Sequence, residues 1–84
     1  MSISQMDLAA RVESLSSRER QVLEMAARGM TNGQIAGSLH VSAHVVKFHL
    51  ASVYRKLGAA NRTQATVLLY ESGIAPRHGI DSVL

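Results

Sequence analysis

The central part of this chain has the composition of a surface that contacts nucleic acid. No Asp or Glu occurs between Met25 and Tyr70. Within that window, the segment Thr31–Leu57 reads TNGQIAGSLHVSAHVVKFHLASVYRKL. Basic side chains without neighbouring carboxylates attract the phosphate backbone of DNA. The basic residues inside the window include Lys47, Arg55, Lys56 and Arg62.

Four side chains in this segment are candidates for contact with bases. If residues 43–57 form a helix, His44, Lys47, Phe48 and Ala51 share its outward face. Lys47 can donate to guanine O6 and N7, and Phe48 can pack on thymine methyl groups. His44 lies in the first turn, where base contacts concentrate. The periodicity leaves open whether Phe48 is exposed or whether a slightly rotated helix buries its ring.

A second set of side chains is expected to contact phosphates, which gives affinity without sequence discrimination. Arg55 and Lys56 would do so as cations near the end of the predicted helix. Thr31 and Asn32 would use the free N–H groups of a helix start, although N-capping alone explains Thr31 equally well. The full expected set is Thr31, Asn32, Ser42, Arg55, Lys56 and Arg62.

The elements that must position these side chains are predicted from their caps. A Ser, Thr or Asn followed three positions later by Glu or Gln has capping-box spacing, in which side chains satisfy free backbone N–H groups at a helix start. This spacing occurs at Ser16 with Glu19, at Thr31 with Gln34, and at Asn61 with Gln64. We therefore predict an all-α fold of four helices, which cover approximately residues 16–28, 31–39, 43–57 and 61–72.

The turn between the second and third predicted helices is Leu39–Ser42. We expect His40 in the left-handed conformation that Gly would adopt more cheaply, and Ser42 as the cap of the third helix. Gly33 and Gly37 lie inside the second helix and each lower its intrinsic stability by roughly 1 kcal/mol relative to Ala. Packing must therefore hold this helix in place.

The last predicted helix carries two neighbouring stripes of side chains. One stripe can pack on the domain while the other meets a second copy of the chain, although a single wide core-facing stripe is the alternative. The expected packing stripe is Ala65, Leu68, Leu69 and Ser72, and the expected dimer interface is Thr63, Val67, Tyr70 and Ile74.

Composition restricts the class of protein. The chain has 84 residues and no cysteine, which suits one small domain and excludes a disulfide framework or a thiolate zinc site. The net charge is +3, and residues 16–58 hold six bases against two acids. No apolar run approaches membrane-spanning length and no signal peptide is evident, so we expect a soluble, cytoplasmic protein without a membrane partner.

We divide the chain into an arm or linker over residues 1–15, a DNA-binding domain over residues 16–74, and a tail over residues 75–84. In the arm, Ile3, Met6, Ala10 and Val12 give only a weak helical face, because Ser and Gln dilute it. The three histidines at positions 40, 44 and 49 are not spaced as metal ligands, and no nucleophile–base arrangement is present. We therefore expect no metal, no cofactor and no enzymatic activity.

Residues 15–74 resemble the LuxR/FixJ-type (GerE-like) helix-turn-helix domain of bacterial transcription regulators. The motifs are LSSRERQVLEMAARGMTNGQIA, LHVSAHVVKFHLASVYRKLG and ANRTQA, in this order. The resemblance implies a four-helix domain, often the output domain of a response regulator, whose third helix enters the major groove. It also implies dimerisation, often through the fourth helix, and transcription control at the bacterial nucleoid, with RNA polymerase as a further candidate partner.

Several positions depart from the family pattern. Val45 stands where the family usually has Thr, and Ala51 stands where some relatives carry a basic residue that contacts bases. His40 replaces the usual turn glycine, and Gly33 and Gly37 replace polar helix formers. These differences predict a distinct sequence preference and a weaker second helix.

The leading hypothesis is sequence-specific binding of double-stranded DNA by a dimer. One alternative is the related fourth region of a sigma factor, but the block KLGAANRTQA followed by another apolar helix favours the LuxR type. The other is a protein-interaction module with weak or no independent DNA binding, which Val45 and Ala51 support and the acid-free window opposes. The target sequence, the regulating signal and the direction of regulation do not follow from these residues.

Overall fold

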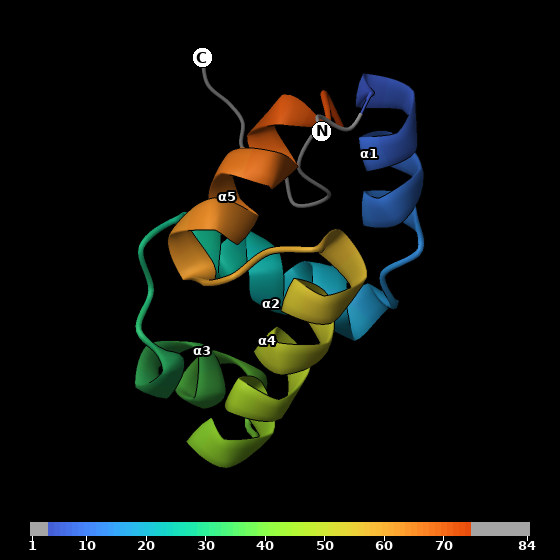
Figure 1. The fold of residues 1–84 in the computed structure, drawn as a ribbon. Coiled ribbons are helices and arrows are strands. Elements are labelled where there is room, and N and C mark those ends of the chain that lie inside the picture. Colours follow the sequence, from blue (N-terminus) through green and yellow to red (C-terminus); the bar gives the residue numbers. More distant parts are fainter. Residues whose placement is uncertain (1–3, 75–84) are drawn as a thin grey trace.

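Five α-helices make up the part of the chain that the computed structural model describes, residues 4–74, and this part contains no strand (Figure 1). The all-α class is confirmed, and each of the four predicted helices is present. The predicted tail over residues 75–84 lies outside the described residues. The helices are α1 (Gln5–Glu13), α2 (Ser17–Ala27), α3 (Asn32–Leu39), α4 (Ala43–Leu57) and α5 (Arg62–Glu71).

The capping boxes that predicted α2 and α3 are both formed. The Glu19 N–H donates to Ser16 Oγ at 3.0 Å, and the Ser16 N–H donates to Glu19 Oε1 at 2.9 Å. Thr31 and Gln34 make the same reciprocal pair at 3.1 and 2.8 Å. Each box satisfies N–H groups that have no partner within the helix, so the helix starts are fixed locally by sequence.

The turn between α3 and α4 has the predicted left-handed residue. His40 has φ 59° and ψ 41°, and it has the only positive φ among the non-glycine residues of the described chain. The next N–H, that of Val41, donates to the Ala36 carbonyl at 3.0 Å, which satisfies one of the last carbonyls of α3. The Ser42 hydroxyl oxygen then accepts the Val45 N–H at 3.1 Å and caps the start of α4.

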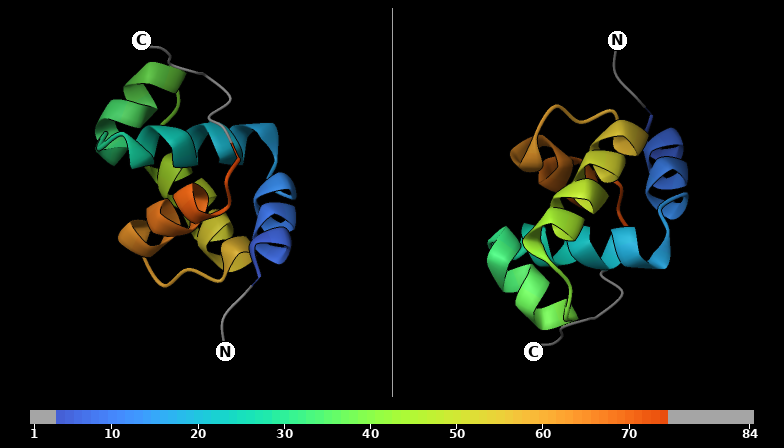
Figure 2. Two further views of the ribbon diagram at one scale, coloured as in Figure 1. Left: turned by 90° about the horizontal axis from the view of Figure 1, so that it is seen from above. Right: turned by 90° about the horizontal axis from the view of Figure 1, so that it is seen from below.

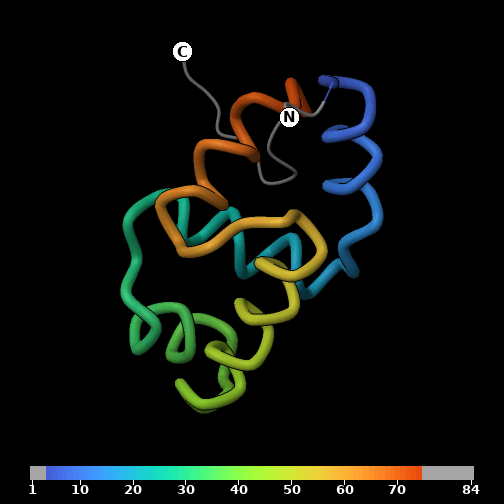
Figure 3. Tube along the Cα trace, viewed as in Figure 1, coloured from blue at the N-terminus to red at the C-terminus, as the bar shows by residue number. Residues whose placement is uncertain are grey.

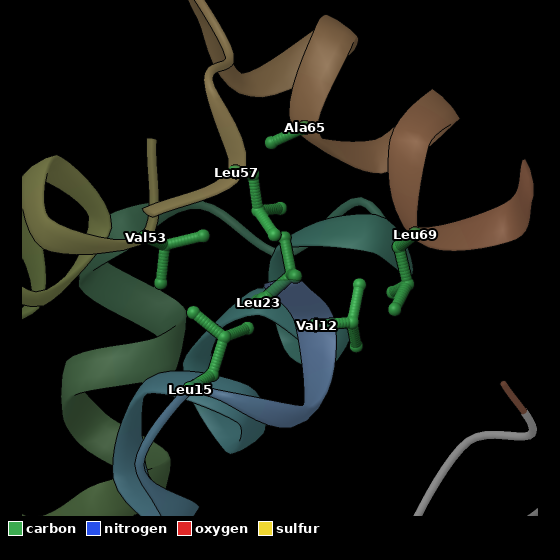
Figure 4. Close-up of a cluster of buried hydrophobic side chains, with 7 residues drawn as sticks. All are labelled: Val12, Leu15, Leu23, Val53, Leu57, Ala65 and Leu69. Carbon is green, nitrogen blue, oxygen red and sulfur yellow. The ribbon is translucent and has the colours of Figure 1, made fainter. Parts of the chain in front are cut away.

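The core consists of two clusters that share α2 and α4. One cluster joins α2, α3 and α4 and contains the fully buried side chains of Val22, Ile35 and Val46. The other joins α1, α2, α4 and α5, and Figure 4 shows its side chains pointing toward one another. This second cluster consists of Val12, Leu15, Leu23, Val53, Leu57, Ala65 and Leu69. Tyr54 packs against both clusters, so α4 forms the continuous spine of the fold (Figure 3).

The helix α1 was not part of the four-helix prediction, which treated residues 1–15 as an arm or linker. Its buried side chains are Leu8 and Val12, whereas Met6 is 83% exposed and Ala10 is also exposed. Of the weak face predicted from Ile3, Met6, Ala10 and Val12, Val12 packs on the core and Met6 and Ala10 do not, while Ile3 lies outside the described residues. Two apolar contacts in a nine-residue helix are too few to stand out in the sequence, and the neighbouring helices supply the surface that holds it.

No helix within residues 4–74 combines the length and the hydropathy that crossing a membrane requires.

Candidate nucleic-acid interface

The first half of α4 presents its outward side chains to solvent at the end of the molecule away from α1 and α5 (Figure 1). The four residues predicted to contact bases, which we call the recognition face, are all exposed: His44, Lys47, Phe48 and Ala51. Phe48 is 71% exposed, so the structure selects the exposed position over the buried one that the periodicity left open. Viewed from below, this helix lies across the front of the molecule (Figure 2).

The ring of Phe48 has one aromatic neighbour, His49. Their centroids are 6.1 Å apart and their planes make an angle of 65°, an edge-to-face arrangement. Val45, which replaces the usual Thr, is 36% exposed and lies one turn before Phe48 and His49. The start of α4 therefore exposes apolar carbon beside the Lys47 ammonium, a combination that suits thymine methyl groups next to a guanine.

A buried carboxylate fixes the second half of α4 on α2. Glu19 is 7% exposed and accepts three hydrogen bonds through its two oxygens. Ser52 Oγ donates to Oε2 at 2.6 Å, and Lys56 Nζ donates to Oε1 at 2.8 Å. The third donor is the backbone N–H of Ser16, already described as part of the capping box. The same side chain thus caps α2 and ties two successive turns of α4 to it.

These contacts determine the ionisation of Glu19. Burial raises the pKa of this carboxyl, but the hydrogen bonds from Lys56, Ser52 and the Ser16 backbone, together with the Lys56 charge, outweigh it. The net effect lowers the pKa from 4.5 to about 2. Glu19 is therefore a carboxylate at any pH near neutrality, and it keeps a full negative charge against Lys56.

The network changes the interpretation of Lys56. The sequence predicted a phosphate contact for this residue, but the structure places its ammonium on the Glu19 carboxylate, on the flank of α4 that faces α2. The neighbouring Arg55 is exposed, and its Nη2 makes a 3.4 Å contact to Ser52 Oγ. Of the two predicted phosphate partners at this end of α4, both are exposed, but within the described residues only Lys56 is held in an ion pair.

Two further predicted phosphate contacts are brought together with each other. Arg62, the first residue of α5, donates through Nη1 to the Met30 carbonyl at 2.8 Å and through Nη2 to the side-chain oxygen of Asn32. Arg62 and Asn32 are both half-buried. This guanidinium therefore fixes the α2–α3 loop and the start of α3 against α5, and it has less freedom to reach a phosphate.

Thr31 and Ser42 are exposed, and both act as N-caps. Each hydroxyl oxygen accepts a backbone N–H of its own helix, as described above. Their position at the starts of α3 and α4 is compatible with a phosphate near either helix end, where the helix dipole favours negative charge. The capping role is the one that the structure contains.

The two stripes predicted on α5 are separated in the structure. Ala65, Leu69 and Ser72 are buried against the domain, while Thr63, Val67 and Tyr70 are exposed. Val67 is 45% and Tyr70 69% exposed, and both are large apolar side chains. Ile74, the fourth residue of the expected interface, is half-buried and packs against the core cluster around Leu57.

A shallow pocket of about 220 Å³ adjoins this exposed face of α5. Its lining residues are Leu69, Tyr70, Gly73 and Ile74. The wide single core-facing stripe, which was the alternative for this helix, does not match these exposures. The described surface of α5 has apolar area available to a partner.

Sequence reasoning missed the polar side chains that hold α4 in place. Glu19 was identified only as a capping residue, and Ser52 was not singled out at all. A third such residue is Arg11 of α1, whose Nη1 donates to the Leu57 carbonyl at the end of α4 at 3.3 Å. A buried position for Glu19 could have been inferred from its place beside the apolar stripe of Val22, Leu23 and Ala26, but its partners depend on how α2 and α4 cross.

The geometry defines a helix-turn-helix domain: a short capped helix, a left-handed turn residue and a longer exposed helix, packed on α2 and closed by α5. A comparison with known protein families supports this classification. Residues 13–69 match the bacterial regulatory proteins of the LuxR family, and the chain belongs to this family.

Individual relatives match over the same part of the chain. YhjB of Escherichia coli strain K12 is 47% identical over 58 residues, which is 69% of this chain and 29% of that protein. The nitrate/nitrite response regulator protein homolog of Haemophilus influenzae is 43% identical over 60 residues, 71% of this chain and 29% of that protein. The transcriptional regulator MalT of Yersinia enterocolitica is 46% identical over 55 residues, 66% of this chain but 6% of that protein. The chain therefore spans less than a third of the length of these relatives.

Proposed function

We propose that this chain binds double-stranded DNA sequence-specifically, as a dimer, and thereby regulates transcription in the bacterial cytoplasm, at the nucleoid. The observation that carries the proposal is the recognition face of α4. It is solvent-exposed, it includes the Lys47 cation, and within the described residues no hydrogen bond or ion pair involves the side chain of Lys47 or His44. A helix anchored by its opposite face and unengaged on its outer face is suited to enter the major groove.

Base discrimination in this proposal comes from Lys47, Phe48, His44 and Ala51. Lys47 donates to guanine O6 and N7, and the exposed Phe48 ring packs on a thymine methyl group. His44 lies in the first turn of α4, where it can reach a base edge or a neighbouring phosphate. Ala51 is small enough to allow close approach of the helix to the groove floor.

Phosphate contact in this proposal falls mainly on Arg55 and on the helix starts at Thr31 and Ser42. Arg55 is exposed and supplies a charge-assisted donor. Lys56, Asn32 and Arg62 are secondary candidates, since Lys56 is held in an ion pair with Glu19, and Arg62 and Asn32 are half-buried and hydrogen-bonded to each other. Phosphates could recruit them only through side-chain rearrangement or through donors that these partners leave unused.

Dimerisation in this proposal uses Thr63, Val67, Tyr70 and Ile74 of α5. The support is the exposed apolar area of Val67 and Tyr70 and the adjoining pocket. Two copies related by a two-fold axis would place their recognition helices on half-sites roughly one helical turn of DNA apart. RNA polymerase is a further candidate partner for a regulator of this class.

The test is a DNA-binding titration after selection of a preferred site from random duplexes. Lys47→Ala should relax discrimination at one base step by about 1–3 kcal/mol. Arg55→Ala is the matched variant on the same helix, and it should weaken all sequences about equally and reduce the salt slope by about one. If Lys47→Ala changes neither affinity nor base preference, the assignment of the recognition face is wrong.

A protein-interaction module of the same fold is the second candidate. The apolar residues exposed at the start of α4, Val45 and Phe48, favour it, because exposed apolar side chains also suit a protein partner. Such a module would show no salt-dependent binding to duplex DNA and would bind a protein partner tightly. The same titration therefore separates the two candidates.

A further inference from the structure

Helix α1 contacts the ends of two helices that the proposed function uses. In Figures 1 and 2 it lies beside the C-terminal ends of both α4 and α5. The matched family region begins at residue 13, the last residue of α1, so the family likeness does not account for this helix.

The contact with α4 is made by Arg11. Its Nη1 donates to the Leu57 carbonyl at 3.3 Å, which is one of the carbonyls left without an intrahelical partner at the end of a helix. A cation at this position also interacts favourably with the partial negative charge of the helix C-terminus. Gly58, the next residue, has φ 72°, and a Cβ built there would lie 3.0 Å from the same Nη1. The Arg11 guanidinium therefore lies against the backbone at the end of α4.

The contact with α5 repeats the arrangement with a different donor. Gln5 Nε2 donates to the Glu71 carbonyl at 3.2 Å, at the end of α5. Gly73, two residues further on, has φ 74°, and a Cβ there would lie 2.9 Å from Gln5 Nε2. Two polar side chains of one short helix therefore hold the last carbonyls of two other helices, each beside a glycine in the left-handed region.

Apolar side chains between Gln5 and Arg11, or next to them, hold α1 against the core of the domain. Leu8 is 3% exposed and Val12 is fully buried, and Val12 belongs to the same core cluster as Leu57 and Leu69. Because Gln5, Leu8 and Val12 follow helical spacing, they face the domain together, and Arg11 lies beside them. Displacement of α1 would remove both caps and open this cluster.

We propose that α1 is a positioning element for DNA binding, with Arg11 as its principal positioning residue: by capping α4 at Leu57, it fixes the last turn of the recognition helix, which carries the phosphate-binding Arg55. This inference rests on the proposed function. It assigns Arg11 no contact with DNA. Loss of the cap lets the last turn of α4 fray, and a frayed turn holds Arg55 less well against the phosphate backbone.

The experiment measures duplex DNA binding by the 84-residue chain at several salt concentrations, with wild type, Arg11→Met, Arg11→Lys and Arg18→Met. Arg11→Met keeps the length and apolar stem of the side chain but removes its donor and charge. We expect it to weaken binding by roughly fivefold to tenfold and to lower the salt slope by about one. Arg11→Lys keeps a charge and a donor, and it should restore most of both quantities.

Arg18→Met is the matched control, because Arg18 is exposed on α2 and the variant loses the same charge. If Arg11→Met and Arg18→Met bind with the same affinity and slope while the wild type binds normally, the inference is overturned. The slope does not depend on the active fraction of protein, so it decides the matter even if Arg11→Met is partly unfolded. Failure of the wild type to bind DNA would instead refute the proposed function.

Discussion

The two halves of α4 are held in different ways, although they belong to one continuous helix. The first half, from Ala43, is fixed by buried apolar side chains and by the Ser42 cap, and its polar side chains extend into solvent. The second half, up to Leu57, is also fixed by buried apolar side chains, but in addition it makes hydrogen bonds with polar side chains of two other helices. Glu19 of α2 binds Ser52 and Lys56, and Arg11 of α1 binds the last turn.

The second half of α4 therefore carries the polar contacts that fix the helix on the domain, and the first half carries side chains that face solvent. A recognition helix must have a defined orientation, yet the side chains that meet bases must remain unengaged until DNA arrives. Concentrating the polar anchors in the second half leaves Lys47 and Phe48 in the first half without such ties. The comparison also predicts which substitutions affect stability and which affect binding.

The largest expected effect is a loss of stability when the core around the second half of α4 is disrupted. Leu57 is fully buried in the cluster shared by four helices, so Leu57→Ala should lower the free energy of unfolding by about 3 kcal/mol through lost burial and the remaining cavity. Phe48→Ala, in the exposed half, should change it by less than about 0.5 kcal/mol. Urea denaturation of both variants tests the comparison, and a similar loss in the two would contradict it.

A smaller effect is expected at Glu19. Its pKa lies below its ordinary value in the folded state, so the stability it adds is complete above about pH 4.5 and is lost as the pH falls toward 2. Glu19→Gln should lower the free energy of unfolding by about 2 kcal/mol at pH 7, after allowance for the partly exposed Lys56, and should flatten this acid dependence.

Chemical denaturation at a series of pH values between 2 and 7 measures this effect. Glu13→Gln is the control, since Glu13 is exposed and belongs to α1. If the wild type and Glu19→Gln lose stability equally on acidification, the Glu19 contacts do not anchor α4.

The smallest expected effects come from replacing with alanine one glycine inside a helix and one glycine at the end of a helix. A Cβ at Gly37 of α3 would meet no atom within 4 Å, and its φ is not positive, so Gly37→Ala should stabilise the domain by about 0.5–1 kcal/mol. Gly58→Ala should destabilise by about 1 kcal/mol or more, because Gly58 has φ 72° and Arg11 lies close. Thermal unfolding should therefore move in opposite directions for the two variants.

The sequence predicted the local features well. The caps at Ser16, Thr31 and Ser42, the left-handed His40 and the bounds of α4 all depend on residues within a few positions of one another, and the structure confirms them. The exposure of Phe48 was within reach of periodicity but required the rotation of α4 about its axis. That rotation is set by packing on α2 and α3.

The features that sequence did not predict depend on distant parts of the chain. Whether Lys56 faces solvent or Glu19 depends on the crossing of α2 and α4, and the pairing of Arg62 with Asn32 depends on where α5 begins relative to α3. Helix α1 escaped prediction because its stability comes from Arg11, Leu8 and Val12 meeting surfaces made by other helices. The local sequence pattern of residues 1–15 contains no information about those surfaces.

The segregation of charge along the chain has a kinetic consequence. Among the described residues, the exposed acids are Asp7, Glu13 and Glu71, which lie on α1 and at the end of α5, while Lys47 lies on the opposite end of the molecule. No acid lies on α3 or α4, so a polyanion that approaches the Lys47 end meets no carboxylate on these two helices. Attraction at this end therefore acts before contact, and added salt should slow association more than it speeds dissociation.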